Sequence, residues 1–272
     1  MVGSLRPPER VVRAIRTPKI ATLLVLLGLA AVAASAAGTG RAWRALAAAT
    51  AAAVVVDLAL GRVRGWGWIV PDGAALSGMI TAMVLSPAVS WWVVAGTAAL
   101  AIVSKHTLRV RRGHVFNPAA FALVVAALAG WGGQSWWGAT ARSQPFSLAL
   151  LLVGGLLVAD RVNRFPMVGV FLGVWYGLLT FVALWVDPRP VAEAYRAPFV
   201  NVALFFAFFM LDDPPTSAGP RGEQARYGAI VAAVGFALLL SARTLAFLPA
   251  GLLVGNAWVA VRRTRQAAEP RR

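Results

Sequence analysis

Residues 167–186 read MVGVFLGVWYGLLTFVALWV, a run of twenty residues without a charged side chain. A helix needs about 20 predominantly apolar residues to cross the hydrocarbon core of a bilayer. The run is continuous rather than alternating, which excludes a strand of a transmembrane barrel. It therefore predicts a membrane-spanning helix and an all-α membrane protein.

Nine further segments are apolar in the same way, and together they predict a polytopic protein of ten transmembrane helices. The ten segments are 20–37, 43–61, 74–87, 89–104, 117–131, 146–160, 167–186, 198–211, 227–242 and 245–261. Composition agrees, because only 13% of the residues are charged, against about 25% in a soluble domain. We divide the chain into a basic N-terminal segment (1–19), a transmembrane domain (20–262) and a basic tail (263–272).

Lysine and arginine are distributed unevenly between alternate loops. If the N-terminus is cytoplasmic, the cytoplasmic segments hold 20 of the 26 Lys and Arg residues and the outward segments hold 6. Cytoplasmic loops of membrane proteins carry the excess of these residues. The asymmetry predicts that both termini are cytoplasmic (N-in, C-in).

The ten segments also divide into two sets of five, and an odd number per set gives the halves opposite orientations. The third segment of each set is short and ends at a proline-containing motif, VLSP at 84–87 in the first and MLDDPPTS at 210–217 in the second. Short or broken segments at matching places in two halves are typical of inverted repeats around a central site. We therefore expect two inverted five-helix repeats.

The net charge of +16 would indicate a nucleic-acid partner in a soluble protein. Here the basic residues lie in short loops beside apolar runs, so topology explains them, and the expected partner is the lipid bilayer rather than nucleic acid. The absence of cysteine excludes disulfides and cysteine-ligated iron–sulfur clusters. Only His106 and His114 are present, and we expect no metal site.

The outward loop after the fifth segment, GGQSWWGATARSQP at 132–145, collects residue types suited to a cofactor. Thr140 has a hydroxyl, Arg142 can pair with a phosphate, and two tryptophans offer flat aromatic surfaces. Tryptophan at a membrane boundary is also an ordinary interfacial anchor. Residue types alone leave both a cofactor site and a plain interfacial loop open.

Three polar residues lie inside apolar runs. Asp57 is the one carboxylate well inside such a run; it is either a proton- or ion-handling group or an interfacial partner of Arg62, about one turn away. Asn201 and Asn256 are expected to make interhelical hydrogen bonds.

Two motifs lie on the inward side. Asn117-Pro118 follows a basic loop, and Pro118 suits the first position of a helix, whose N-terminus can hold an anion or a polar ring edge. Asp212 and Asp213 lie at a boundary where positive charge is the norm. A ligand-free helix start and a solvated turn remain the alternatives.

Taken together, four features in this order resemble the RnfD/NqrB family, the membrane subunits of Rnf ferredoxin:NAD and sodium-pumping NADH:quinone oxidoreductase complexes. They are DGAALS at 72–77, SKH at 104–106 leading to HVFNP at 114–118, GAT at 138–140, and FMLDDPPTS at 209–217 with PRG at 220–222. The resemblance covers roughly residues 20–262 and implies an inverted-repeat fold similar to that of urea transporters.

The resemblance implies FMN on the outer face, joined to Thr140 by a phosphoester bond. This sequence has Gln134 and Trp137 where the family motif has an acid and a serine or threonine. The residues expected around the flavin are Gly138, Ala139, Trp137 and Arg142.

A second flavin or a quinone is implied near Asn117, Asp213 and Thr216, with other redox subunits or a flavin-carrying protein as partners. The expected function is that of an inner-membrane electron-transfer subunit, whose relatives couple electron relay to ion movement. The alternatives are a flavin-free channel or transporter for a small neutral solute on the same scaffold, and a scaffold subunit that holds partners.

Overall fold

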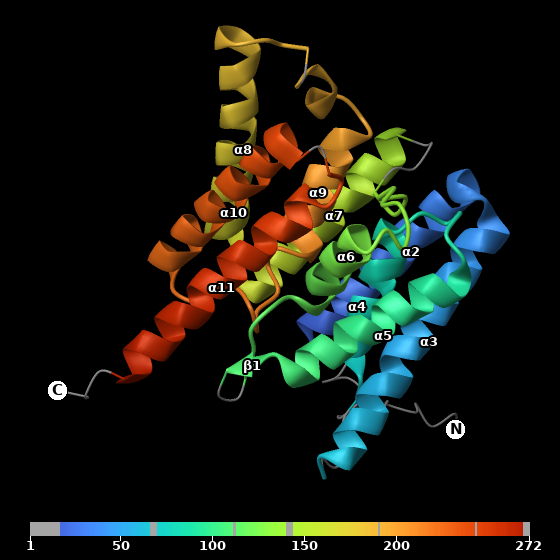
Figure 1. Cartoon of the computed structure of the whole chain (residues 1–272). Helices are drawn as coiled ribbons and strands as arrows, with labels where there is room; N and C mark the ends of the chain where they lie inside the picture. Colours follow the sequence, from blue (N-terminus) through green and yellow to red (C-terminus); the bar gives the residue numbers. More distant parts are fainter. Residues whose placement is uncertain are drawn as a thin grey trace, which may run out of the picture.

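A computed structural model describes residues 17–65, 70–110, 113–139, 144–189, 191–242 and 244–268. Within them the chain forms ten α-helices, a small hairpin and a 3-10 helix, which confirms the all-α prediction (Figure 1). Each α-helix corresponds to one predicted segment. They are α2 (Pro18–Ala37), α3 (Thr39–Val63), α4 (Asp72–Val84), α5 (Trp91–Thr107), α6 (Pro118–Leu128), α7 (Gln144–Val162), α8 (Phe165–Trp185), α9 (Phe199–Phe209), α10 (Arg221–Ala242) and α11 (Phe247–Ala268).

The helices differ in length in a way that matters for the membrane. Five apolar stretches are long enough to cross a bilayer, and they lie in α2, α3, α7, α8 and α10. In contrast, α4 has 13 residues and α6 and α9 have 11 each. At 1.5 Å per residue these helices reach about 17–20 Å, well short of the roughly 30 Å hydrocarbon core. The ends of α4, α6 and α9 therefore lie beside the middle parts of the longer helices.

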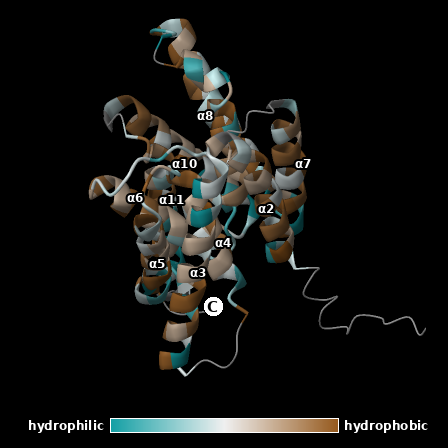
Figure 2. Cartoon of the chain, turned by 90° about the vertical axis from the view of Figure 1, so that its right-hand side faces the viewer, coloured by the Kyte–Doolittle hydropathy of each residue, from teal (hydrophilic) through white to brown (hydrophobic). Residues whose placement is uncertain are grey.

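Large apolar side chains cover much of the outer surface. Leu24, Val55, Phe181 and Leu184 are all strongly exposed, and apolar residues run along the lengths of the helices (Figure 2). Contiguous apolar surface of this extent is unusual on a soluble monomer and marks an interaction surface. Lipid contact accounts for it, so the chain is a multi-pass membrane protein.

Small residues allow the helices to approach closely. A Cβ atom added to Gly78 of α4 would lie 2.8 Å from the carbonyl oxygen of Ala49 in α3, and one at Gly228 of α10 would lie 2.5 Å from that of Met167 in α8. Membrane helices associate by van der Waals packing, so small residues are enriched where backbones meet. Gly78 and Gly228 therefore fix two of the main helix contacts.

The two sets of five helices pack in corresponding ways. α3 packs against α5 as α8 packs against α10, α2 against α4 as α7 against α9, and α5 against α6 as α10 against α11. The pairs α2–α7 and α6–α11 join the two sets. The correspondence is partial, because α4 also packs closely against α5 and α6, whereas α9 makes its close contacts with α7, α8 and η1.

Four local features differ from the prediction. α10 begins six residues early, at Arg221, and α11 continues to Ala268. The charged end of α11 stays helical because Arg262 pairs with Glu223 at 3.0 Å and Arg263 donates to two loop carbonyls. Polar contacts between helices determine the start of α10 and the end of α11. A hydropathy pattern does not detect such contacts. The hairpin of β1 (Arg109–Val110) and β2 (Gly113–His114) and the 3-10 helix η1 (Ala192–Tyr195) were also not predicted.

Candidate functional site

A cavity of about 500 Å³ lies where the ends of six helices meet, and we call it the larger cavity. The starts of α2, α4 and α6 and the ends of α5, α7 and α9 contribute to its wall. Its apolar lining includes Leu76, Ile80, Val158 and Phe209. Its polar lining residues include Lys19, Asp72, Lys105, His114, Asn117, Asp212 and Asp213. Its size, apolar walls and few converging polar groups are those of a small-molecule site.

Asn117 connects three parts of the cavity wall. Its side-chain oxygen accepts from the backbone N–H of Ala120 at 3.0 Å, which caps α6, and Pro118 takes the first helical position as predicted. Its amide nitrogen donates to the carbonyl of Met210 at 3.2 Å, and its backbone N–H donates to Asn256 Oδ1 at 2.8 Å. These bonds fasten the start of α6 to the end of α9 and to α11.

Asn256 makes the interhelical bonds expected of it. Its Nδ2 donates to the hydroxyl of Tyr227 in α10 at 2.6 Å and to the carbonyl of Thr216 at 3.3 Å. Asn201 is also buried, but its Nδ2 has no hydrogen-bond partner among the described residues. Asn256 therefore joins α6, α10, α11 and the loop after α9.

The loop at 212–219 is clamped by side chains from three helices. Arg164, just before α8, donates to the carbonyls of Ala218 and Gly219. Gln224 of α10 donates to Gly219 O at 2.8 Å, and Arg263 of α11 donates to the carbonyls of Pro215 and Ser217. These carbonyls of the loop therefore accept hydrogen bonds although much of the loop is buried.

Asp212 is the most unusual group in this loop. It is 4% exposed, and its Oδ2 has no hydrogen-bond partner among the described residues. Burial raises the pKa of this carboxyl well above its usual range, and the charge of Asp213 acts in the same direction, while Arg164 opposes them. The carboxyl of Asp212 therefore holds a proton more readily than an exposed carboxyl does.

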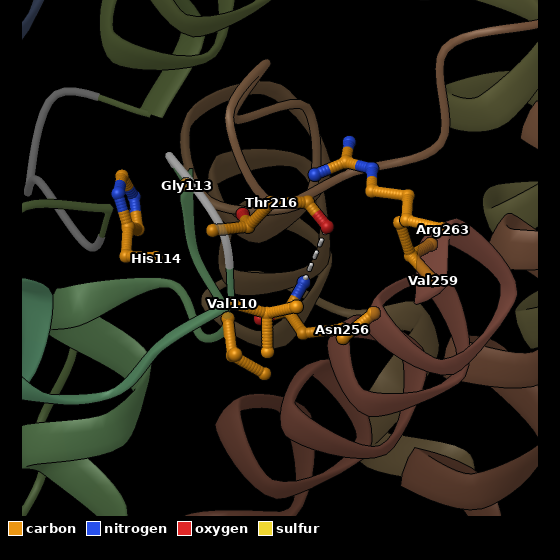
Figure 3. A pocket seen from close by; sticks show the side chains of 9 residues that line it. Val110, Gly113, His114, Thr216, Asn256, Val259 and Arg263 are labelled. Carbon is orange, nitrogen blue, oxygen red and sulfur yellow. Dashed lines mark hydrogen bonds between the residues drawn. The ribbon is translucent and has the colours of Figure 1, made fainter. Parts of the chain in front are cut away.

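A second cavity of about 280 Å³, the smaller cavity, lies between the hairpin and α11 (Figure 3). Its lining includes His114, Thr216, Asn256 and Arg263. His114 also lines the larger cavity, and its Nε2 is 3.9 Å from Asp213 Oδ2. Asp213 Oδ2 accepts from the hydroxyl of Thr216 at 2.8 Å. His114 and Asp213 therefore separate the two cavities.

Two lysines of the larger cavity are held by carboxylates. Lys19 Nζ is 2.7 Å from Asp72 Oδ1, and Lys105 Nζ is 2.9 Å from Asp57 Oδ1. Asp57 Oδ1 also lies 2.8 Å from Nε2 of the buried His106. The ion pair between Asp57 and Lys105 crosses from α3 to α5. Asp57 therefore helps to orient Lys105 at the cavity wall.

Asp57→Leu is expected to lower the free energy of unfolding by roughly 1–3 kcal/mol, because it leaves Lys105 and His106 without their shared acceptor. Thermal unfolding in detergent measures the change. Asp72→Leu is the matched control, and it should cost less than about 1 kcal/mol because the side chain of its partner Lys19 is 52% exposed. Equal losses in the two variants would contradict this role for Asp57.

The loop before Thr140 is anchored to the other end of α4. Backbone bonds join Ser86 N to Gly133 O and Gly138 N to Met83 O, and Leu85 pairs with Gln134 in an isolated bridge. The indole of Trp137 is buried and donates to Ala82 O at 2.6 Å. A Cβ atom at Gly138 would lie 2.6 Å from Met83 Cβ, so the loop lies directly on the short helix. Trp137 thus serves to hold the loop.

The predicted site residues fall into two groups. Asn117 and Asp213 line the larger cavity, and Thr216 lines the smaller one. Gly138, Ala139 and Trp137 lie together in the loop at the far end of α4. Thr140 and Arg142 lie outside the described residues.

Sequence reasoning missed the residues that clamp the 212–219 loop, namely Arg164, Gln224 and Arg263. Arg164 and Arg263 lie in basic end segments, where the positive-inside rule already explains an arginine. No local pattern marks Gln224. Their role emerges only when three helix ends that are distant in sequence are brought together.

Comparison with known protein families and with curated proteins finds no match to this chain.

Proposed function

We propose that this protein is an inner-membrane electron-transfer subunit of the RnfD/NqrB type, with a planar redox ring bound in the larger cavity. One observation carries the proposal. Three of the four features that resemble the family, at 72–77, 104–118 and 209–217, contribute residues to this one cavity. Residues separated by more than a hundred positions would not gather there if the motifs were unrelated turn signals.

The cavity suits a flat ring with polar edges. Phe209, Leu76 and Ile80 supply apolar wall, while Asn117, Asp212 and Asp213 supply polar groups. Asp212 adds a buried carboxyl to this wall, and its Oδ2 has no hydrogen-bond partner among the described residues. A flavin or a quinone bound here would supply the capacity to accept and release electrons. The chain's residues bind and orient the ring and exclude water from its apolar side.

Packed aromatic rings fill the space between the outward loop and the larger cavity. Trp136 meets Phe205 edge-on, with ring centroids 6.3 Å apart, and the centroid of Phe205 is 5.2 Å from that of Phe209. Phe209 lines the larger cavity, and Trp136 lies four residues before Thr140. This packing favours passage of electrons over passage of a solute, which needs an open path.

The helix packing supports the architecture that the resemblance implies. Three helix pairs correspond between the two sets of five, namely α3–α5 with α8–α10, α2–α4 with α7–α9, and α5–α6 with α10–α11. The six helix ends around the larger cavity adjoin the loops rich in Lys and Arg, so we assign this end to the cytoplasm and both termini with it. The loop at 131–139 then belongs to the outer half, which suits a flavin on Thr140 that passes electrons inward.

Binding of a ring to the larger cavity is the direct test. The purified chain in lipid nanodiscs is titrated separately with riboflavin, with FMN and with a short-chain quinone, and quenching of flavin or tryptophan fluorescence is measured. Leu76→Trp fills the cavity and should weaken binding at least about tenfold, which corresponds to about 1.4 kcal/mol.

Leu24→Trp is the matched control, because Leu24 is 61% exposed on the outer surface of α2. It should bind the ring as the unchanged protein does. If no ring binds, or if Leu76→Trp binds it equally well, the proposal fails. Flux of a small neutral solute into liposomes containing the protein would then support a channel, and its absence a scaffold subunit.

A further inference from the structure

Among the residues that the structure describes, His114 is the one that lines both cavities. It ends the hairpin, and Figure 3 shows its side chain at the left of the view, with Thr216 in the middle and Arg263 on the right. Its Nε2 lies 3.9 Å from Asp213 Oδ2, a separation that one bridging water spans. Histidine changes its charge near physiological pH, which makes it the usual proton-transfer group. His114 is therefore a polar group that the two cavities share.

Asp212 lies on the far side of this boundary. It follows α9 directly, lines the larger cavity and is buried, with Oδ2 unbonded among the described residues. Next to it in the chain, Asp213 lines the same cavity. A carboxyl group next to a cavity and out of contact with bulk water can hold a proton and release it to a ligand.

The charged groups around Asp212 come from several neighbouring elements, including Arg263 of α11, which donates to two carbonyls of the same loop. Asp213 belongs to its own loop, and Arg164 approaches from the start of α8. Lys19 and Asp72 pair with each other across the same cavity, and Lys105 is paired with Asp57. The nearby charges from α2, α4 and α5 therefore cancel in pairs, which leaves Asp213 and Arg164 as the principal influences on Asp212.

We propose that His114 and Asp213 form a proton-transfer path from the smaller cavity to Asp212, so that the larger cavity keeps a proton ready for its ligand. The identity of the ligand rests on the proposed function, whereas the proton path and the protonation of Asp212 do not. The hydroxyl of Thr216 donates a hydrogen bond to Asp213 Oδ2, and this bond holds the carboxylate toward His114.

The transfer balances as a net movement of one proton. The O–H bond of Asp212 breaks and its proton passes to a basic atom of the ligand, which leaves Asp212 as a carboxylate. His114 takes a proton from water in the smaller cavity and passes it by way of the bridging water and Asp213. Asp212 is then protonated again, and His114 and Asp213 return to their starting states.

Infrared spectroscopy of the ligand-free protein in nanodiscs tests the path. The unchanged protein should show the C=O stretching band of a protonated carboxylic acid at neutral pH, and Asp212→Asn should lose it. Asp187→Asn, which changes an exposed carboxylate paired with Arg189, is the control and should keep the band. Absence of the band in the unchanged protein, or its persistence in Asp212→Asn, overturns the proposal.

The path is tested by the rate at which this band shifts in heavy water. In His114→Gln the exchange should slow on the order of a hundredfold, the low end of the contribution of a positioned proton-transfer group. Asp213→Asn should also slow it while the band remains. Equal rates of hydrogen–deuterium exchange at Asp212 in these variants and in the unchanged protein would contradict the proposed path. Since no ring is present, this failure is distinct from failure of the ring-binding test.

Discussion

Thr140→Ala is expected to abolish the flavin fluorescence of the denatured, gel-separated protein when the chain is produced together with a flavin transferase of known activity. A phosphoester bond needs a hydroxyl, and alanine has none. The loop before this position is held to the end of α4 by the bonds from Gly138 to Met83 and from Trp137 to Ala82. These anchors do not involve residue 140, so the variant should fold normally.

Thr140→Ser is the matched control, because it keeps the hydroxyl and should keep the band. A band that survives in Thr140→Ala would locate the covalent flavin elsewhere. No band in the unchanged protein would exclude covalent flavin and leave the ring of the larger cavity as the only redox group of the proposal. The covalent flavin at Thr140 and the ring in the larger cavity are therefore tested independently.

The helices could be predicted from the sequence because hydrocarbon imposes a strong and local constraint. Every backbone polar group of a segment in the bilayer must be bonded within the protein, so a continuous apolar run is a helix. The prediction was weakest at helix ends. α10 and α11 extend beyond their apolar cores because Glu223 and Arg262 pair across them, an interaction between residues 39 positions apart.

The site could be predicted only in pieces. Asn117 stood out at a helix start and Asp213 at an acidic boundary, but the resemblance to the RnfD/NqrB family is what grouped them with Thr216 as a predicted site. Their grouping around two cavities with a shared His114 depends on how six helix ends meet, and no single stretch encodes that. The partner of Asp57 could not be read from the sequence either, because Lys105 lies on another helix.

Gly228→Val is expected to destabilise the protein by roughly 3 kcal/mol, at the upper end of what overpacking costs. The added Cβ would lie 2.5 Å from the carbonyl oxygen of Met167 and 3.1 Å from the backbone nitrogen of Phe171. Backbone atoms cannot turn aside as a flexible side chain can, so α8 and α10 must separate. A melting temperature several degrees lower in detergent would show the loss.

Gly169→Val, on the exposed face of α8, is the matched control, since a Cβ there meets nothing within 4 Å. Both variants introduce the same β-branched residue into a helix, so the difference between them isolates the α8–α10 contact.

Separation of these helices should also pull Arg164 and Gln224 away from the carbonyl of Gly219, which they share. The loop that carries Asp212 would lose its clamp, and Gly228→Val should therefore bind the ring more weakly while Gly169→Val binds it normally. Equal stability of the two variants would show that the close contact between α8 and α10 does not hold the site together.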